Sequence, residues 1–285
     1  DVTKEQLSEM MVGHKVNLTV TKDDHEPSDV VLKVDHLSYQ PKTSDKLLLN
    51  DVSFEVRKGE IVCIAGIDGN GQSELIYNLT GLEQPNMGHV YLNDEEITHK
   101  SIRYRNDHGL SHIPEDRHKH GLVLDYTLGE NLILKSYYKK DFQNHCIINF
   151  DAMNTYADHL IEEYDVRSGE GRNSIVRGMS GGNQQKAIIA REVEQNDDLL
   201  IAVQPTRGLD VGAIEFIHKQ IVKARDNNKA VLLVSLELDE VMNLSDRILV
   251  MYEGEIVADL NPKETTIQEL GLYMAGSKRG EGYEK

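Results

Sequence analysis

The segment IAGIDGNGQS at residues 64–73 has the glycine spacing of a loop that could bind phosphate. Gly66 and Gly71 enclose four residues, and Ser73 follows where a hydroxyl could hold Mg²⁺. Glycines let backbone N–H groups point at phosphate oxygens, and a helix starting near Gly71 would add its positive end. The lysine that reaches the β- and γ-phosphates is replaced by Gln72, so the loop alone could equally be a plain turn. The candidate ligand-binding residues of this loop are Gly66, Gly69, Asn70, Gly71, Gln72, Ser73 and Glu74.

A second candidate site is the segment MSGGNQQKAIIAREV at residues 179–193. A serine and two glycines open an amphipathic helical pattern. The segment resembles the LSGGQ signature of ATP-binding cassette (ABC) proteins: Ser180, Gly181 and Gly182 match, and Asn183 replaces the usual glutamine. The resemblance implies that these four residues contact the γ-phosphate of ATP held by a second cassette.

The order of the motifs is also similar to that of ABC proteins. Tyr39 follows a strand-like segment, where the family has an aromatic residue that stacks on adenine. The glycine loop comes next, followed by IPEDR at 113–117, the signature, LLIAVQPTRGLD at 199–210 and VSLELDEV at 234–241. The resemblance covers about residues 30–276. It implies an α/β fold of the P-loop NTPase class: an ABC nucleotide-binding domain with a RecA-like core, an antiparallel β layer and a helical subdomain.

Two further groups of residues receive a role from this resemblance. Glu115, Asp116 and Arg117 resemble the Q-loop, which implies contact with a transmembrane permease. The residues that resemble the D-loop, which a cassette presents to its partner, are Gly208, Leu209 and Asp210.

The chain departs from the family's catalytic pattern at several positions. Gln72 stands at the loop lysine, and Leu236 stands at the switch histidine. Val203 and Gln204 stand where the Walker B segment has the aspartate that organises Mg²⁺ and the glutamate that polarises the attacking water. Glu115 replaces the Q-loop glutamine. Losing one stabilising group costs about 2–4 kcal/mol of barrier, so we predict that this chain alone hydrolyses ATP negligibly. Several unrelated changes favour natural degeneracy over an engineered trap.

The segments GxxGNGQSEL, PEDR, SGGNQQK and PTRGLDVGA together resemble the second cassette of tandem ATPases in simple-sugar and nucleoside importers. The resemblance implies ATP as ligand, an intact partner cassette in the N-terminal half, transmembrane permease subunits, and a peripheral cytoplasmic location on the inner face of the cell membrane. Nucleosides are the expected solute, with ribose- or galactose-type sugars second. The signature would complete the partner's site, while the chain's own site binds nucleotide weakly or without turnover.

Two other functions stay open at this point. One is a self-sufficient ATPase that uses substitute groups, and the other is a soluble ABC protein that acts on nucleic acid or ribosomes. The 31 Lys and Arg residues stand against 48 Asp and Glu residues, a formal net charge of −17. Such a surface repels phosphate backbones, so we expect no nucleic-acid partner.

The elements that would position these motifs follow from hydrophobic patterning. After Glu60, GEIVCIAGI is apolar throughout and predicts a buried strand, while SELIYNLTGL predicts a helix after the glycine loop. LLIAVQ, VGAIEFIHKQIVKARDNN and AVLLVSL predict strand, helix and strand, as in an α/β domain with a largely parallel sheet. RILVMYEGEIVADL predicts a hairpin across Glu253–Gly254, and GLSHIPEDRHKHGL predicts a loop.

The chain begins with Asp and carries two similar helical segments, at residues 3–13 and 266–276. We therefore expect a piece of a tandem protein that starts with the tail of one cassette and ends with the tail of the next. The expected boundaries are a preceding tail at 1–15, a linker at 16–29, the nucleotide-binding domain at 30–276 (core lobe 30–114 and 187–263, helical subdomain 115–186) and a flexible tail at 277–285.

The two cysteines, Cys63 and Cys146, lack a metal-type spacing, and no disulfide framework is expected. Cys63 lies in the apolar run IVCIAG, which predicts a buried small hydrophobe. No apolar run approaches the length of a membrane span.

Overall fold

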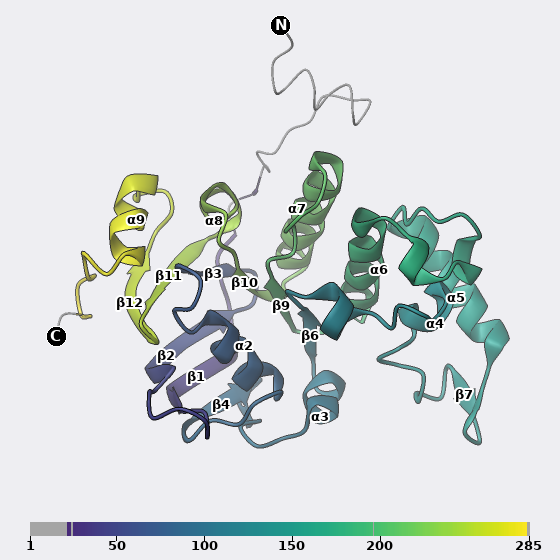
Figure 1. Cartoon of the computed structure of the whole chain (residues 1–285), viewed down its shortest axis with the longest axis horizontal. Helices are drawn as coiled ribbons and strands as arrows, with labels where there is room; N and C mark the ends of the chain where they lie inside the picture. The colour runs from purple at the N-terminus through teal and green to yellow at the C-terminus, as the bar shows by residue number, and fades with distance from the viewer. Residues whose placement is uncertain (1–21, 24, 196, 284–285) are drawn as a thin grey trace, which may run out of the picture. The chain divides into compact units, whose positions relative to one another are not determined.

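The computed structural model describes residues 22–23, 25–195 and 197–283 (Figure 1). The chain divides into two compact units. We call the larger the core unit (residues 20–112, 196–204 and 221–285) and the other the helical unit, whose described part is 113–195 and 205–220. The predicted preceding tail at 1–15 and the start of the predicted linker at 16–29 lie outside the described residues.

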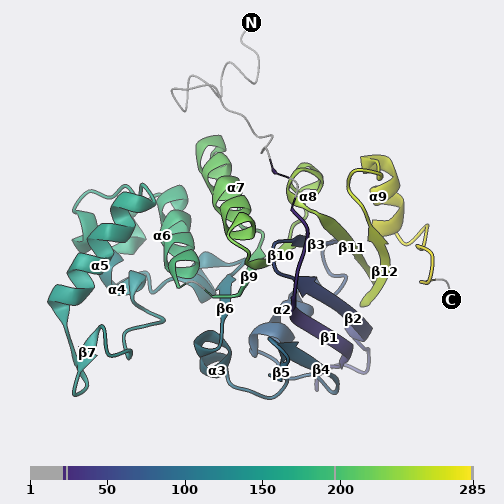
Figure 2. The ribbon, with the colours of Figure 1, turned by 180° about the vertical axis from the view of Figure 1, so that it is seen from behind.

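An antiparallel sheet with the strand order β2-β1-β4-β5 forms one layer of the core unit. Figure 2 shows β1, β2 and β4 side by side. Buried Leu32 and Val34 flank exposed Lys33 in β1, as expected for a strand with one face packed on a core. The strands are β1 (Val30–Tyr39), β2 (Leu49–Arg57), β4 (Met87–Leu92) and β5 (Glu95–Glu96).

A second sheet has the strand order β12-β11-β3-β10-β9-β6. Its strands are β3 (Ile61–Ala65), β6 (Leu110–Ile113), β9 (Leu199–Val203), β10 (Ala230–Val234), β11 (Arg247–Tyr252) and β12 (Glu255–Leu260). The pairs β11–β3, β3–β10 and β10–β9 are parallel, whereas β11 and β12 are antiparallel, which confirms the predicted hairpin. Every residue of β3, β9 and β10 is buried, as in strands covered on both faces.

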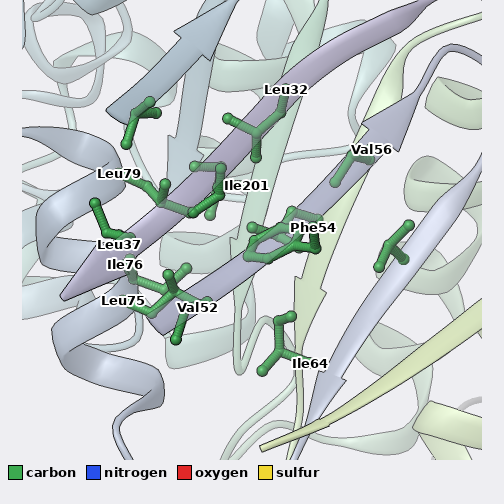
Figure 3. Packing of buried hydrophobic residues seen from close by; sticks show 14 of the residues in the cluster. Leu32, Leu37, Val52, Phe54, Val56, Ile64, Leu75, Ile76, Leu79 and Ile201 are labelled. Carbon is green, nitrogen blue, oxygen red and sulfur yellow. The ribbon is translucent and has the colours of Figure 1, made fainter. Parts of the chain in front are cut away.

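The helix that follows the glycine loop packs against the antiparallel sheet. In α2 (Gln72–Thr80), Leu75 and Leu79 are fully buried. Figure 3 shows them beside Leu37 of β1 and Val52 of β2, in one apolar cluster that also includes side chains from β3, β9 and β10. Burial of such side chains stabilises the fold by roughly 25 cal/mol per Å² of apolar surface, so this packing fixes the helix and the loop before it.

Arg105 fixes the other end of α2. It lies in α3 (Ile102–Asp107) and its side chain is fully buried. The guanidinium donates hydrogen bonds to the carbonyl oxygens of Asn78 (2.8 Å), Leu79 (2.6 Å) and Thr98 (2.8 Å). The last carbonyls of a helix lack intrahelical partners, and a cation there is favourable. The remaining helices of the core unit are α8 (Leu238–Leu244) and α9 (Ile267–Met274).

The described part of the helical unit contains the helices α4, α5 and α6, the first part of α7 and a short hairpin. The elements are α4 (Leu128–Leu132), β7 (Gln143–Asn144), β8 (Ile147–Ile148), α5 (Phe150–Glu163), α6 (Gly181–Glu194) and the first part of α7 (Val211–Asp226). Thr127 and Glu130 form a capping box at the start of α4. The predicted helical subdomain at 115–186 lies inside this unit, which also contains residues 187–195 and 205–220.

Two expectations from the sequence differ from the structure. GLSHIPEDRHKHGL is not only a loop, because β6 and a π-helix at Arg117–Gly121 occupy most of it. The tail after residue 276 is fixed rather than free as far as Tyr283: the Gly280 N–H donates to Val257 O (2.9 Å), and Arg279 pairs with Glu255 (3.0 Å). Within the described ranges, no helix is both long and apolar enough to cross a membrane.

Candidate functional site

The glycine loop connects β3 to α2, as predicted. Gly69 and Gly71 have φ angles of 87° and 105°, in the left-handed region that favours glycine. A side chain at Gly71 would also collide with its surroundings, because a Cβ there would lie 2.7 Å from the carbonyl oxygen of Leu48. Gly71 is the N-cap of α2 and makes no side-chain cap, so the first N–H groups of the helix are left for another acceptor.

The hairpin turn between β11 and β12 holds the loop in place. Asn70 O accepts a hydrogen bond from Gly254 N (2.9 Å), and Asn70 Oδ1 accepts one from Glu253 N (3.2 Å). The carbonyl of Gly254 in turn accepts a hydrogen bond from Asn50 N (2.9 Å). Asn70 is therefore a structural clamp of the loop, a role that the sequence motif did not reveal.

Gln72 replaces the lysine of the loop with a neutral side chain that is buried. Its exposed fraction is 6%, and its Nε2 lies against Gly66, where an added Cβ would be 2.4 Å away. This Nε2 has no hydrogen-bond partner among the described residues. Ser73 and Glu74 follow in the first turn of α2, and both are half-buried.

The other positions for which the resemblance implies a catalytic role lie at the same end of the sheet. Val203 is the last residue of β9 and pairs with Val234 of β10, while Gln204 N donates to Val234 O (2.7 Å). Leu236 lies two residues beyond the end of β10. Strand β10 is parallel to both β3 and β9, so these side chains and the glycine loop all follow the carboxyl ends of adjacent strands. Ligands bind at such strand ends in open α/β sheets.

The donor set at these strand ends does not suit Mg²⁺, which prefers oxygen ligands in octahedral geometry. Ser73 offers a hydroxyl, but Val203 is aliphatic and 4% exposed. No group of three His, Cys, Asp or Glu side chains among the described residues could hold a metal ion. The loop itself suits phosphate better, because it combines glycine geometry, a free helix N-terminus and the Gln72 Nε2 donor.

Tyr39 does not present an open ring. It is the last residue of β1, is 9% exposed and belongs to the apolar cluster of the core unit. Burial, followed by a hydrogen bond with Glu83, raises the pKa of the Tyr39 hydroxyl. A register irregularity in the β1–β2 pairing lies between Leu37 and Tyr39, and Leu37, Ser38 and Tyr39 are all buried. The adenine contact of Tyr39 stays a prediction.

The signature residues form the start of α6 in the helical unit. Ser180 is the N-cap, and its Oγ accepts hydrogen bonds from Asn183 N (3.4 Å) and Asn183 Nδ2 (3.0 Å). Asn183 Oδ1 accepts a hydrogen bond from Arg167 N (2.8 Å). Gly182 lies close to Asp210, since an added Cβ would be 3.3 Å from Asp210 Oδ2. The structure therefore brings the predicted signature and D-loop residues together.

These residues line a pocket of about 490 Å³ in the helical unit. The sequence did not reveal that Asp165, Arg167 and Lys186 also line it. Asp165 pairs with Lys186 (2.9 Å) and with Arg167 (3.1 Å). The hydrogen bond from Lys186, followed by that from Arg167, lowers the pKa of the Asp165 carboxyl, so this pocket wall carries paired charges.

The D-loop residues are fixed by a turn and by a buried glutamine. Gly208 has a φ of 71°, and Leu209 N donates to Thr206 O (3.2 Å). Asp210 Oδ1 accepts a hydrogen bond from Ala213 N (2.9 Å) at the start of α7. Buried Gln185, which follows the signature, donates through Nε2 to Pro205 O (2.9 Å). The two motifs thus share a direct hydrogen bond between their flanking residues.

The residues that resemble the Q-loop lie between β6 and the π-helix. Glu115 pairs with Arg207 (2.6 Å), and Asp116 caps the π-helix. Backbone hydrogen bonds, the largest from Lys119 N–H, lower the pKa of the Asp116 carboxyl. Arg117 Nη2 faces Gly181, where an added Cβ would be 3.0 Å away. Contact of these residues with a permease stays a prediction.

Comparison with known proteins gives three findings. The family model described as "ABC transporter" matches residues 49–207. The chain is 51% identical over 281 residues to the guanosine import ATP-binding protein NupO of Bacillus subtilis and 47% identical over 281 residues to the nucleoside import ATP-binding protein NupA of Lactococcus lactis subsp. cremoris. Each alignment covers 99% of this chain and 55% of the relative, so the chain spans about half the length of these curated relatives.

Solved structures show the fold. A nucleotide-free ATP-binding cassette from an ABC transporter superposes with a TM-score of 0.70 at 20% identity, over 86% of this chain and 99% of that one. An ATP-binding subunit of an ABC transporter gives 0.70 at 22% identity, over 86% and 99%. The predicted fold class is thereby confirmed as an α/β cassette with a P-loop NTPase sheet. The chain belongs to the ABC transporter family.

Proposed function

We propose that this chain is an ATP-binding cassette of an importer, that it pairs with an intact second cassette and with transmembrane permease subunits, and that it acts at the cytoplasmic face of a cell membrane. Its own ATP site is degenerate, and its signature residues complete the site of the partner cassette. The transported solute is a nucleoside, with ribose- or galactose-type sugars second. No nucleic-acid partner is proposed, given the net charge of −17.

The observation that carries the proposal is the contrast between the two candidate sites. At the strand ends of the core unit, the catalytic positions hold Gln72, Val203, Gln204 and Leu236, none of which is an acid, a base or a cation. Around the pocket of the helical unit, Ser180, Gly182 and Asp210 keep the residue types of the family and lie together. The residue types that are lost serve hydrolysis of the chain's own nucleotide. The residue types that are kept belong to the motifs that a cassette presents to its partner.

The names of the relatives support the order of the proposed solutes. The relative at 51% identity is named for guanosine import and the relative at 47% identity for nucleoside import, whereas the ribose import ATP-binding protein of Clostridium tetani is 35% identical. The cassette carries no solute site of its own in this proposal, so the similarity of the whole chain is the argument for the solute.

The test uses the importer assembled with its partner cassette and permease. Ser180→Arg fills the pocket at the signature, and we expect it to lower ATP hydrolysis by about 10²-fold or more, as for loss of a stabilising donor at a transition state. Gln204→Ala changes the degenerate site and is expected to leave the rate within about twofold, because an amide there supplies no base. Arg177→Gln, an exposed change in the same unit, is the matched control.

The reverse pattern would overturn the proposal. Hydrolysis that survives Ser180→Arg but falls with Gln204→Ala would show that the chain turns over its own ATP. The same conclusion would follow if the 285-residue chain alone hydrolysed ATP as fast as an intact cassette.

A further inference from the structure

Glu115 and Arg207 connect two motifs that lie far apart in the sequence. Glu115 Oε1 accepts a hydrogen bond from Arg207 Nη1 (2.6 Å), and the two side chains form an ion pair within the helical unit. Glu115 stands at the position of the Q-loop glutamine, and Arg207 directly precedes Gly208 of the D-loop. A glutamine at position 115 would carry no charge, so the ion pair depends on the residue that departs from the family's pattern.

Arg117 makes a second connection, between the D-loop and the signature. Its Nη1 donates a hydrogen bond to Arg207 O (3.5 Å), and its Nη2 would lie 3.0 Å from a Cβ added to Gly181. The same added Cβ would lie 3.8 Å from Leu209 Cδ2 of the D-loop. The Nε of Arg117 is inaccessible to solvent, so the side chain is enclosed rather than extended outward. The guanidinium therefore stands between the start of α6 and the D-loop.

The segment that carries these two side chains is itself fixed along α6. Asp116 caps the π-helix that follows. His118 Nε2 forms a hydrogen bond with Gln184 Oε1 of α6 (2.9 Å). A Cβ added to Gly121 would lie 2.7 Å from Ile188 Cδ1, so the backbone of the π-helix approaches α6 closely. Because this base is fixed, contacts made by its side chains hold the D-loop against α6.

We propose that Glu115 and Arg117 are positioning residues, which hold the D-loop against the start of α6 so that both motifs meet the partner cassette in one fixed arrangement. We call Glu115, Arg117 and Arg207 the motif clamp. The inference rests on the proposed function, in which the signature and the D-loop serve the partner's site. Glu115 and Arg117 do not line the pocket of the signature residues, so they act through Arg207 and Gly181. Misplacing a group that acts on a reacting phosphate by about 1 Å can cost about 10²-fold in rate.

The exposure of the ion pair sets the size of the expected effect. The Arg207 side chain is 65% exposed and the Glu115 side chain is 37% exposed. Exposed ion pairs contribute little to the stability of a fold. The motif clamp therefore favours one arrangement of the two motifs without holding the helical unit together, and its loss should change the rate of hydrolysis more than the stability of the chain.

The experiment measures kcat for ATP hydrolysis by the importer assembled with its partner cassette and permease, together with the Tm of the 285-residue chain. Glu115→Arg and Arg207→Glu each place two like charges side by side. We expect each variant to lower kcat by about three- to tenfold, because an attraction is lost and a repulsion of similar size is added. The Tm should fall by about 3 °C or less, since the pair is exposed. Arg117→Met removes the second connection and should lower kcat by a similar factor.

A charge-swapped double variant makes the test specific. Glu115→Arg combined with Arg207→Glu restores the attraction with the charges exchanged, so kcat should return to within about twofold of the wild-type value. If Glu115 acted instead on a group of the permease, the second substitution would not help, and the double variant would stay as slow as the slower single variant. Asp158→Arg is the matched control, since it reverses an exposed carboxylate of α5 that pairs with Arg172 in the same unit, and it should leave kcat unchanged.

The inference is overturned if Glu115→Arg or Arg207→Glu leaves kcat at the wild-type value, or if the charge swap recovers none of the loss. It is also overturned if the Tm of the single variants falls by about 10 °C or more, because loss of folded chain would then explain the rate. Failure of the proposed function gives a different result. Hydrolysis that is lost in Ser180→Arg but unchanged in Glu115→Arg would leave the role of the signature standing and remove that of the motif clamp.

Discussion

Asn183 Nδ2 donates a hydrogen bond of 3.0 Å to Ser180 Oγ, so the fourth residue of the signature orients the hydroxyl of the first. The same amide accepts a hydrogen bond from Arg167 N through Oδ1 (2.8 Å). One side chain thus joins the signature to the segment that carries Asp165 and Arg167. The family's usual glutamine is one methylene longer. The shorter side chain of Asn183 reaches both Ser180 Oγ and Arg167 N.

Replacing Asn183 by leucine removes both hydrogen bonds at similar volume. We expect the free energy of unfolding to fall by about 0.5–1.5 kcal/mol, because the contacts are neutral and partly exposed. Urea titration of the 285-residue chain measures this change. Asn183→Asp keeps the acceptor for Arg167 N and separates the two contacts, and an unchanged urea midpoint in Asn183→Leu would show that neither matters.

Removing Arg105 should destabilise the core unit. Arg105→Met leaves the carbonyls of Asn78, Leu79 and Thr98 without their donor, and we expect a loss of roughly 2–4 kcal/mol. Arg105→Lys should recover little, because an ammonium cannot reproduce the fork of the guanidinium. The midpoint of urea unfolding reports both variants, and full recovery with lysine would contradict the role of the fork.

Gly71→Ala tests the geometry of the phosphate loop. The φ of 105° and the carbonyl of Leu48 both oppose a side chain there, and we expect a loss of about 1–3 kcal/mol with a local change in the loop. Gly169→Ala is the control, since Gly169 has no atom within 4 Å of an added Cβ. Thermal unfolding compares the two, and equal Tm values would show that the loop tolerates a side chain.

The two thiols should differ in reactivity. Burial raises the pKa of Cys63 to about 12, whereas Cys146 is exposed. Because the thiolate is the nucleophile, Cys63 stays protonated and inert at pH 8 and would ionise only as the pH approaches its raised pKa. A thiol reagent at pH 8 should therefore modify only Cys146 in the folded chain and both cysteines in urea. Rapid modification of both cysteines in the folded chain would contradict this.

The sequence predicted most of the core unit because its patterns are local. The run IVCIA is apolar at every position, a pattern typical of a strand covered on both faces, and it forms β3. Glu253–Gly254 has residue types typical of a tight turn, so the sequence also predicted the β11–β12 hairpin. The order of motifs singled out Gln72, Val203 and Leu236, and the structure shows that these residues follow the carboxyl ends of adjacent parallel strands.

The remaining features depend on contacts that no local pattern encodes. The sequence did not indicate that Tyr39 is largely buried in the apolar cluster of the core unit. The sequence predicts the segment before the signature only as part of a helical subdomain at 115–186, and no motif indicated the hydrogen bond from Arg167 N to Asn183. The π-helix at Arg117–Gly121 depends on the capping carboxylate of Asp116, in a segment rich in residues typical of loops.

The attachment of the last residues to the sheet has a practical consequence for protein production. Glu255 receives hydrogen bonds from Arg279 and from Asn50 Nδ2 (2.7 Å), next to the turn that clamps Asn70. A chain truncated after Gly276 would leave the Glu255 carboxylate, whose side chain is 15% exposed, with one partner fewer. Expression vectors for this cassette should therefore extend at least to Tyr283. A shorter chain would lose the Arg279 contact and weaken the β11–β12 turn that holds the phosphate loop.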